Sequence, residues 1–221
     1  MGDSVTVTPR LSPLPDGFAA TVSALHRVAE DVVAPARKPD NEIALEPTPG
    51  GFGTPVFEWE GSTHRIRVQG AELVREVDGE QERTPLEVDP TAAAVLADWY
   101  SFGAAVLERL AAEAGPEETP PAPILWPEHF DLAIELGSEP QGLRATYGFS
   151  PGDEQHGEPY AYVGPWVAQP SGEVWNALGF GGAEMGYADL LAAADPGVTA
   201  LNFFTTRRDA LAQTKPNEET K

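Results

Sequence analysis

Residues 89–115 read DPTAAAVLADWYSFGAAVLERLAAEAG, and the rest of the fold is organised around this segment. Asp89 is suited to cap the N-terminus of a helix, and Pro90 fits the first helical turn. Apolar side chains recur at helical spacing from Val95 to Leu110, until Gly115 ends the pattern. The segment therefore predicts a long helix with an apolar face that other elements must cover.

The residues before this helix predict a shorter helix followed by an antiparallel meander. After Asp16, apolar residues recur at helical spacing until Pro35 and Pro39 end the pattern. Between residues 41 and 86 the apolar period changes to two, which is typical of strands, and the Asp78–Gly79 pair predicts a tight hairpin turn. We interpret the glycine cluster at residues 50–53 as a further turn.

A proline- and glutamate-rich stretch at residues 115–124 predicts an extended connector to the second half. Beyond it, apolar patterning predicts strands at 129–136, 142–150, 159–166 and 174–180, then helices at 187–194 and from Asp195 onward. The predicted fold class is α+β: a helix plus an antiparallel strand meander in each half, sharing one core, with C-terminal helices. The predicted parts are a flexible N-terminal segment (1–15), a helix/meander/helix half (16–114), the connector, a second meander with C-terminal helices (125–212) and a disordered tail (213–221).

Composition excludes several classes of partner. The chain has 221 residues and a formal net charge of −21, so we expect neither nucleic acid nor a membrane as a partner. It has no cysteine, which rules out disulfides, a thiolate nucleophile and zinc–thiolate sites. No apolar run approaches the roughly 20 residues that span a bilayer, and the first residues do not read as a signal peptide. We therefore expect a soluble, cytoplasmic protein.

Charge is concentrated in the second half. Between Leu110 and Thr206, fourteen acidic residues accompany one basic residue, Arg144, which gives a local charge of −13. The same region holds three of the five tryptophans and four of the five tyrosines. Carboxylates and aromatic ring faces both attract cations. We therefore predict a binding site for a small cationic or amphipathic molecule, with these ligand-binding residues: Trp126, Arg144, Glu158, Tyr160, Tyr162 and Trp166. Arg144 is alternatively a structural ion-pair partner of the surrounding acids.

A second hypothesis is a metal-dependent or acid–base hydrolase that uses the loop at residues 150–159. If this loop folds over the polar face of the preceding strand, imidazole and carboxylate groups from both segments could hold a divalent metal ion, with Glu158 as the base. The candidate ligands are His129, Asp131, Asp153, Glu154 and His156. Residues 148–152 match Gly-x-Ser-x-Gly, but Pro151 lacks the N–H that a nucleophile elbow needs after its serine.

Three blocks of the second half carry a resemblance. They are LWPEHFDLAI at 125–134, YGFSPGD at 147–153 and EPYAYVGPW at 158–166. These blocks resemble those of uncharacterised proteins from high-GC actinobacteria. The resemblance implies no activity, cofactor or catalytic residue.

Three functions remain open on the sequence alone: the cation-binding module, the hydrolase, and a non-enzymatic structural or interaction protein. In the third, the carboxylates serve solubility and the aromatic residues fill the core. Convergent acidic and aromatic side chains in a pocket would favour the first hypothesis. Neighbouring His129 and His156 rings would favour the second, and an exposed apolar patch without a pocket would favour the third.

Overall fold

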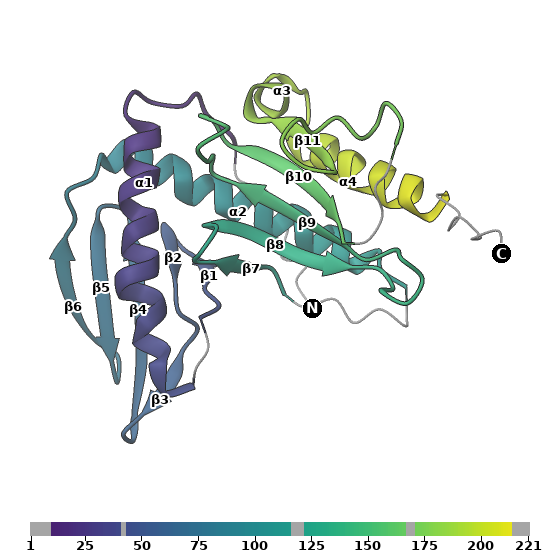
Figure 1. The fold of residues 1–221 in the computed structure, drawn as a ribbon. Helices are drawn as coiled ribbons and strands as arrows, with labels where there is room; N and C mark the ends of the chain where they lie inside the picture. The colour runs from purple at the N-terminus through teal and green to yellow at the C-terminus, as the bar shows by residue number, and fades with distance from the viewer. Residues whose placement is uncertain (1–9, 41–42, 116–121, 167–170, 214–221) are drawn as a thin grey trace, which may run out of the picture.

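The computed structural model describes residues 10–40, 43–115, 122–166 and 171–213. Within these ranges the protein is α+β, with four α-helices and two antiparallel sheets (Figure 1). The helices are α1 (Phe18–Val28), α2 (Pro90–Ala112), α3 (Tyr187–Ala192) and α4 (Pro196–Gln213). Helix α1 continues into a short π-helix (η1, Ala29–Val33) and then a 3-10 helix (η2, Ala34–Asp40). The two predicted C-terminal helices are thus confirmed.

The first sheet contains β1 (Glu46–Thr48), β2 (Gly51–Gly53), β3 (Phe57–Trp59), β4 (Ser62–Gln69), β5 (Glu72–Val77) and β6 (Glu80–Pro85). The strand order is β1-β2-β4-β5-β6, and β3 also pairs with β4. The interpretation of residues 50–53 as a turn is wrong for β2, where Gly51 runs so close to β4 that a Cβ atom would collide with the Val68 carbonyl. Of the residues in this cluster, Gly50 alone belongs to the turn, with φ +78°.

The second sheet has the order β11-β10-β9-β8-β7. Its strands are β7 (Ile124–Trp126), β8 (Asp131–Leu136), β9 (Ala145–Ser150), β10 (Tyr160–Pro165) and β11 (Ala183–Gly186). The strand predicted at 174–180 is wrong, because this segment is an irregular loop and β11 lies further along the chain. The Asn176 side chain holds this loop against β11 through hydrogen bonds of 3.0 and 3.1 Å with the Glu184 backbone.

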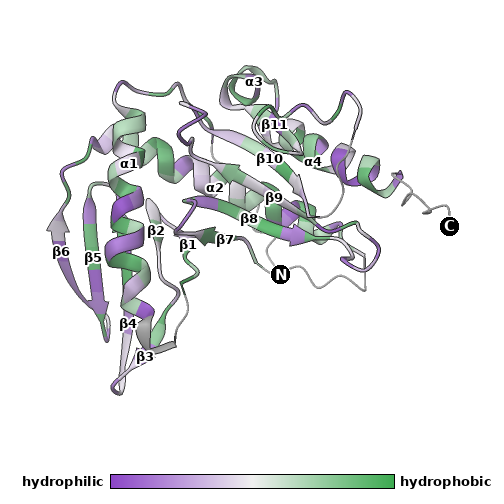
Figure 2. Ribbon diagram, viewed as in Figure 1, coloured by the Kyte–Doolittle hydropathy of each residue, from purple (hydrophilic) through white to green (hydrophobic). Residues whose placement is uncertain are grey.

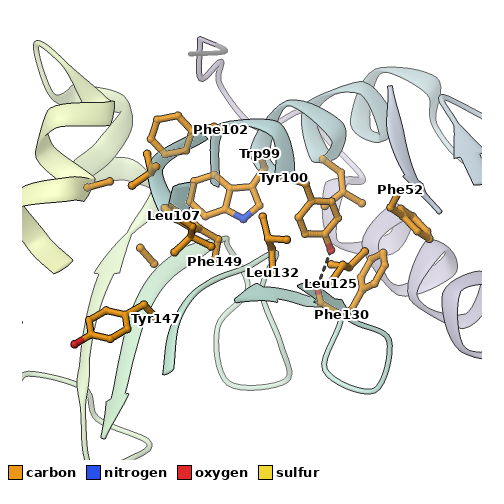
Figure 3. Close-up of a cluster of buried hydrophobic side chains, with 14 of the residues drawn as sticks. Phe52, Trp99, Tyr100, Phe102, Leu107, Leu125, Phe130, Leu132, Tyr147 and Phe149 are labelled. Carbon is orange, nitrogen blue, oxygen red and sulfur yellow. Dashed lines mark hydrogen bonds between the residues drawn. The ribbon is translucent and has the colours of Figure 1, made fainter. Parts of the chain in front are cut away.

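The long helix α2 unites the two sheets. It contacts β1 and β2 of the first sheet and β8 and β9 of the second, so both halves contribute to one hydrophobic cluster. Trp99, Tyr100 and Phe102 of α2 are fully buried in this cluster, where they pack against side chains of both sheets (Figure 3). Two backbone hydrogen bonds between Leu45 and Leu125 also join the sheets, next to β1 and within β7. The predicted shared core is confirmed.

The two faces of the second sheet differ in composition. Leu132, Ile134, Tyr147, Phe149 and Val163 are buried on the face that packs against α2 and α4. Polar residues such as Asp131 and Glu135 lie on the opposite face, and Figure 2 shows hydrophilic positions near both ends of β8 with hydrophobic ones between them. The second face is therefore the one on which a binding site can form.

Several predictions concern residues that the structure does not describe. Most of the predicted N-terminal segment (1–9), the centre of the connector (116–121) and nearly all of the predicted tail (214–221) lie outside the described residues. Within the described ranges, no helix is both long enough and apolar enough to cross a membrane.

Candidate functional site

The second sheet carries a pocket of about 800 Å³ on the face opposite α2 and α4. We refer to it as the acidic pocket. Four carboxylates and one imidazole contribute to its lining, whereas none of the described lining residues is a lysine or an arginine. The lining residues are Trp126, Glu128, His129, Asp131, Glu135, Thr146, Ser150, Asp153, Tyr160, Tyr162, Gly164 and Phe180.

A tight turn between β7 and β8 positions one wall of the acidic pocket. The Phe130 backbone N–H donates to the Trp126 carbonyl at 2.7 Å, and Phe130 adopts φ +54°. This left-handed conformation is unfavourable for a bulky residue. It is stabilised because the Phe130 ring is buried against Phe52, with centroids 5.1 Å apart, while the Phe130 carbonyl accepts a 2.7 Å hydrogen bond from Tyr100. Packing of the core therefore fixes the turn that presents Glu128, His129 and Asp131.

Helix α1 supports the same turn from the first half of the chain. His26 stacks on Phe130 with ring centroids 5.0 Å apart, and its Nε2 lies 2.8 Å from the Pro127 carbonyl oxygen. His26 thus has a structural role, and the wall of the acidic pocket is anchored to both halves of the protein.

Asp131 is the buried carboxylate of the acidic pocket, with 7% of its surface exposed. Its Oδ2 accepts a hydrogen bond from the Tyr162 hydroxyl. Its Oδ1 is buried and has no hydrogen-bond partner among the described residues. Burial raises the pKa of Asp131, although the Tyr162 hydrogen bond and nearby His129 oppose this shift. This oxygen is therefore closed off from the open space of the acidic pocket.

A glycine makes the contact between Tyr162 and Asp131 possible. Tyr162 on β10 is paired with Gly148 on β9, and a Cβ atom at Gly148 would lie 2.5 Å from the Tyr162 ring. Without a side chain at this position, the ring crosses β9 and its hydroxyl reaches Asp131 on β8. Burial and the Asp131 charge raise the pKa of Tyr162, so the hydroxyl stays protonated as a donor.

The loop that precedes β10 contributes Asp153, which is well supplied with donors. Tyr160 donates to its Oδ2 at 2.6 Å, and the backbone N–H groups of Gln155 and His156 donate to its Oδ1 at 2.7 and 2.8 Å. Burial opposes ionisation, but these hydrogen bonds outweigh it and lower the pKa of Asp153. Asp153 is therefore a charged group at the rim that also holds the loop.

Five of the predicted site residues do not line the acidic pocket: Arg144, Glu154, His156, Glu158 and Trp166. Arg144 lies 2.5 Å from Glu135 and over the Trp166 ring, 4.6 Å from its centroid, which supports its interpretation as an ion-pair partner. Glu158 and His156 line a separate hollow of about 240 Å³ beside α3. Glu154 is exposed on the loop.

Six of the predicted residues do line the acidic pocket: Trp126, His129, Asp131, Asp153, Tyr160 and Tyr162. The prediction missed Glu128 and Glu135, although both belong to the same acidic region, and it missed Phe180, which packs edge-on to Tyr162 at 6.3 Å. Phe180 carried no usable signal, because its segment was expected to be a strand.

The predicted metal ligands do not form a metal-binding cluster among the described residues. Across the ranges that the structure describes, no three histidine or carboxylate side chains are arranged to hold a metal ion. His129 lines the acidic pocket, whereas His156 lies between Asp153 and Glu184, at 3.0 and 3.2 Å, beside the smaller hollow. The predicted metal centre stays a prediction, and the geometry does not lead us to propose it.

Comparisons with protein-family models, curated proteins and solved structures found no match. The resemblance to actinobacterial proteins therefore stays a prediction.

Proposed function

We propose that this protein binds a small organic cation with an aromatic or apolar part in the acidic pocket. The observation that carries the proposal is the lining, where four carboxylates converge with aromatic side chains and no described lysine or arginine neutralises the cavity from within. The field of such a cavity attracts cations and repels anions. A volume of about 800 Å³ also falls within the range of small-molecule sites.

The aromatic side chains support the apolar half of this ligand description. Trp126 borders the cavity at the end of β7, and Phe180 lines it beside Tyr162. A cation over an aromatic ring gains about 0.5–1 kcal/mol at an exposed site and about 2 kcal/mol when it is desolvated. An apolar substituent on the ligand would bury further surface against the same rings. Charge and ring contacts together favour an amphipathic cation over a hydrated inorganic ion.

Thermal melts and isothermal titration calorimetry of the full chain test the proposal with three probes of similar shape: 2-phenylethylammonium, neutral 2-phenylethanol and anionic 3-phenylpropionate. We expect the cation to bind best and the anion not to bind. At about 100 times its Kd, a ligand adds about 2.7 kcal/mol of stability. This corresponds to a rise in Tm of roughly 5–10 °C for a chain of this size. Equal binding of the anion, or binding of none of the probes, would overturn the proposal.

Two tryptophans provide a matched control. Trp126 lines the acidic pocket, whereas Trp166 lies outside it under Arg144. We expect Trp126→Ala to weaken binding of 2-phenylethylammonium by about tenfold, from the loss of ring contact. Trp166→Ala should leave the affinity within about twofold of the native value. An equal loss in both variants would contradict the proposed location of the ligand.

A further inference from the structure

We infer that the ligand is an elongated cation that lies along β8–β10, with its charged group at one end of the acidic pocket and an uncharged part at the other, and that Gly164 sets how long this uncharged part can be. This inference rests on the proposed function and narrows its ligand class. It follows from the length of the pocket, from the uneven distribution of its charges and from a glycine that leaves one end open.

The acidic pocket extends along the strands of the second sheet. Tyr160, Tyr162 and Gly164 of β10 all line it, and alternate residues of a strand share one face. Their neighbours on β9 line it too, with Ser150 paired to Tyr160 and Thr146 paired to Gly164. At about 3.4 Å per residue, the two pairs lie about 13 Å apart. We call the Ser150–Tyr160 side the head end and the Thr146–Gly164 side the tail end.

The head end carries an excess of negative charge. Asp153 lies there, because its Oδ2 accepts the Tyr160 hydroxyl at 2.6 Å. Asp131 begins β8, which runs antiparallel to β9, so it lies beside the last residues of β9. Glu128 and His129 belong to the turn that leads into Asp131. Even with a protonated histidine, carboxylates are in excess, so an ammonium group is attracted to this end.

The tail end has one carboxylate among the described lining residues, Glu135, and its charge is compensated. Glu135 is paired with Thr146 in the register of β8 and β9, and Arg144 contacts it at 2.5 Å. The Thr146 hydroxyl already accepts the Trp166 indole N–H at 3.1 Å. A neutralised carboxylate attracts a cation weakly. The tail end therefore suits the uncharged part of a ligand.

Two glycines on this face of the sheet differ in what occupies the space above them. Above Gly148, the Tyr162 ring lies where a Cβ atom would be, within 2.5 Å. A Cβ atom at Gly164 would meet no described heavy atom within 4 Å, apart from its chain neighbours. Gly164 also has no positive φ, so its strand conformation does not require glycine. The missing side chain at Gly164 therefore keeps the tail end open to a ligand.

A matched pair of cations tests this inference by isothermal titration calorimetry on the native full chain. The short probe is 2-phenylethylammonium, and the long probe is 2-(biphenyl-4-yl)ethylammonium, which adds a second ring in line with the first. We expect the long probe to bind roughly tenfold more tightly, because its second ring is buried at the tail end. Equal or weaker binding of the long probe would overturn the inference.

Gly164→Leu then assigns the open end, with Gly115→Leu as the matched control at a similarly open glycine outside the acidic pocket. We expect Gly164→Leu to abolish the roughly tenfold gain of the long probe and to leave the short probe within about twofold of its native affinity. Gly164→Ala, a smaller change in the same strand, should give an intermediate loss. A gain that survives in Gly164→Leu and Gly164→Ala, or an equal loss for both probes, would overturn the role of Gly164.

The orientation of the ligand is tested with two glutamates that both line the acidic pocket, Glu128 at the head end and Glu135 at the tail end. At low ionic strength, Glu128→Gln should weaken binding of the short probe by about three- to fivefold, and Glu135→Gln by about twofold or less. Equal losses, or the reverse order, would overturn the orientation. The proposed function fails separately, if neither cation binds the native chain.

Discussion

The first sheet (β1–β6) and the second sheet (β7–β11) are both antiparallel and both contact α2, but their charged residues are organised differently. In the first sheet, arginines on β4 and β6 pair with glutamates of other strands: Arg65 with Glu46 at 2.7 Å, Arg67 with Glu76 at 3.7 Å and Arg83 with Glu72 at 2.8 Å. In the second sheet, Arg144 neutralises Glu135 alone of the four pocket carboxylates, as far as the described residues go.

This difference separates charge that serves solvation from charge that serves binding. Paired charges on an exposed strand surface keep the sheet hydrated and reduce its net field. Unpaired carboxylates around a concave, ring-lined surface produce a field that a ligand can use. The second sheet keeps one of these carboxylates, Asp131, buried with a free acceptor oxygen, and this arrangement costs stability.

The largest effect is expected where the two sheets meet. Phe130 is 1% exposed, and its ring packs against Phe52 of the first sheet while its backbone enters β8 of the second. Phe130→Ala should lower the free energy of unfolding by about 3–5 kcal/mol through lost burial and a cavity. Urea unfolding measures this change, and Leu178→Ala, at a residue that is 94% exposed, is the control. A loss below about 1 kcal/mol would contradict the anchoring role of this ring.

A second prediction compares two tyrosines that each donate to a pocket carboxylate. Tyr162→Phe removes the side-chain donor of buried Asp131, so it should cost about 1–3 kcal/mol of unfolding free energy. Tyr160→Phe leaves Asp153 with its two backbone donors and should cost less, about 0.5–1 kcal/mol. Urea unfolding of both variants at neutral pH tests the order. Equal costs would show that Asp131 does not depend on Tyr162.

The pH dependence of stability isolates Asp131 from the other acids. Burial raises its folded pKa above the usual 3.8, so the native state binds more protons than the unfolded chain between the two pKa values. The free energy of unfolding contributed by Asp131 therefore falls as pH rises through that window and is constant above it. Asp131→Asn removes this dependence, so its stability relative to the native chain should increase with pH across the window, with a slope of up to about 1.4 kcal/mol per pH unit.

Urea unfolding of both proteins at a series of pH values, from about 3.5 to 7, measures this difference directly, because the other titrating groups are common to both chains. A difference that is flat over this range, or that decreases with pH, would contradict the raised pKa of Asp131.

Local patterns predicted the parts of the fold that depend on local forces. The Asp89 side chain accepts the Ala92 N–H at 2.8 Å, as expected of an N-cap, and α2 follows it. The polar side of β8, where Asp131 and Glu135 line the acidic pocket while Leu132 and Ile134 enter the core, was also visible in the sequence. Segments governed by distant contacts were not predicted. The strand character of Gly51–Gly53 depends on its approach to Val68, and the loop at 174–180 depends on Asn176.

The same distinction applies to the site. The concentration of acids and aromatic residues indicated the correct region, and Asp131, Tyr160 and Tyr162 lie in the acidic pocket. The composition of this region could not show that the Trp166 ring would lie against Arg144, or that His156 would contact Glu184. These residues are close to the others in the sequence. In the structure, however, their side chains contact partners outside the acidic pocket.

The smallest effect separates the two kinds of arginine. Arg83→Gln in the first sheet and Arg144→Gln in the second each remove one partly exposed ion pair, so each should cost about 0–1 kcal/mol of unfolding free energy. Their effects on ligand binding should differ, because Glu135, the partner of Arg144, lines the acidic pocket. Removing its counter-ion makes the cavity more negative.

Calorimetric titration with 2-phenylethylammonium at low ionic strength should then give a roughly twofold gain in affinity for Arg144→Gln. Arg83→Gln should bind as the native chain does, and the gain should disappear at high salt because mobile ions screen the added charge. If both variants gained affinity equally, the cation would be responding to net protein charge and not to the pocket. If Arg144→Gln lost affinity, Arg144 would itself be part of the binding site.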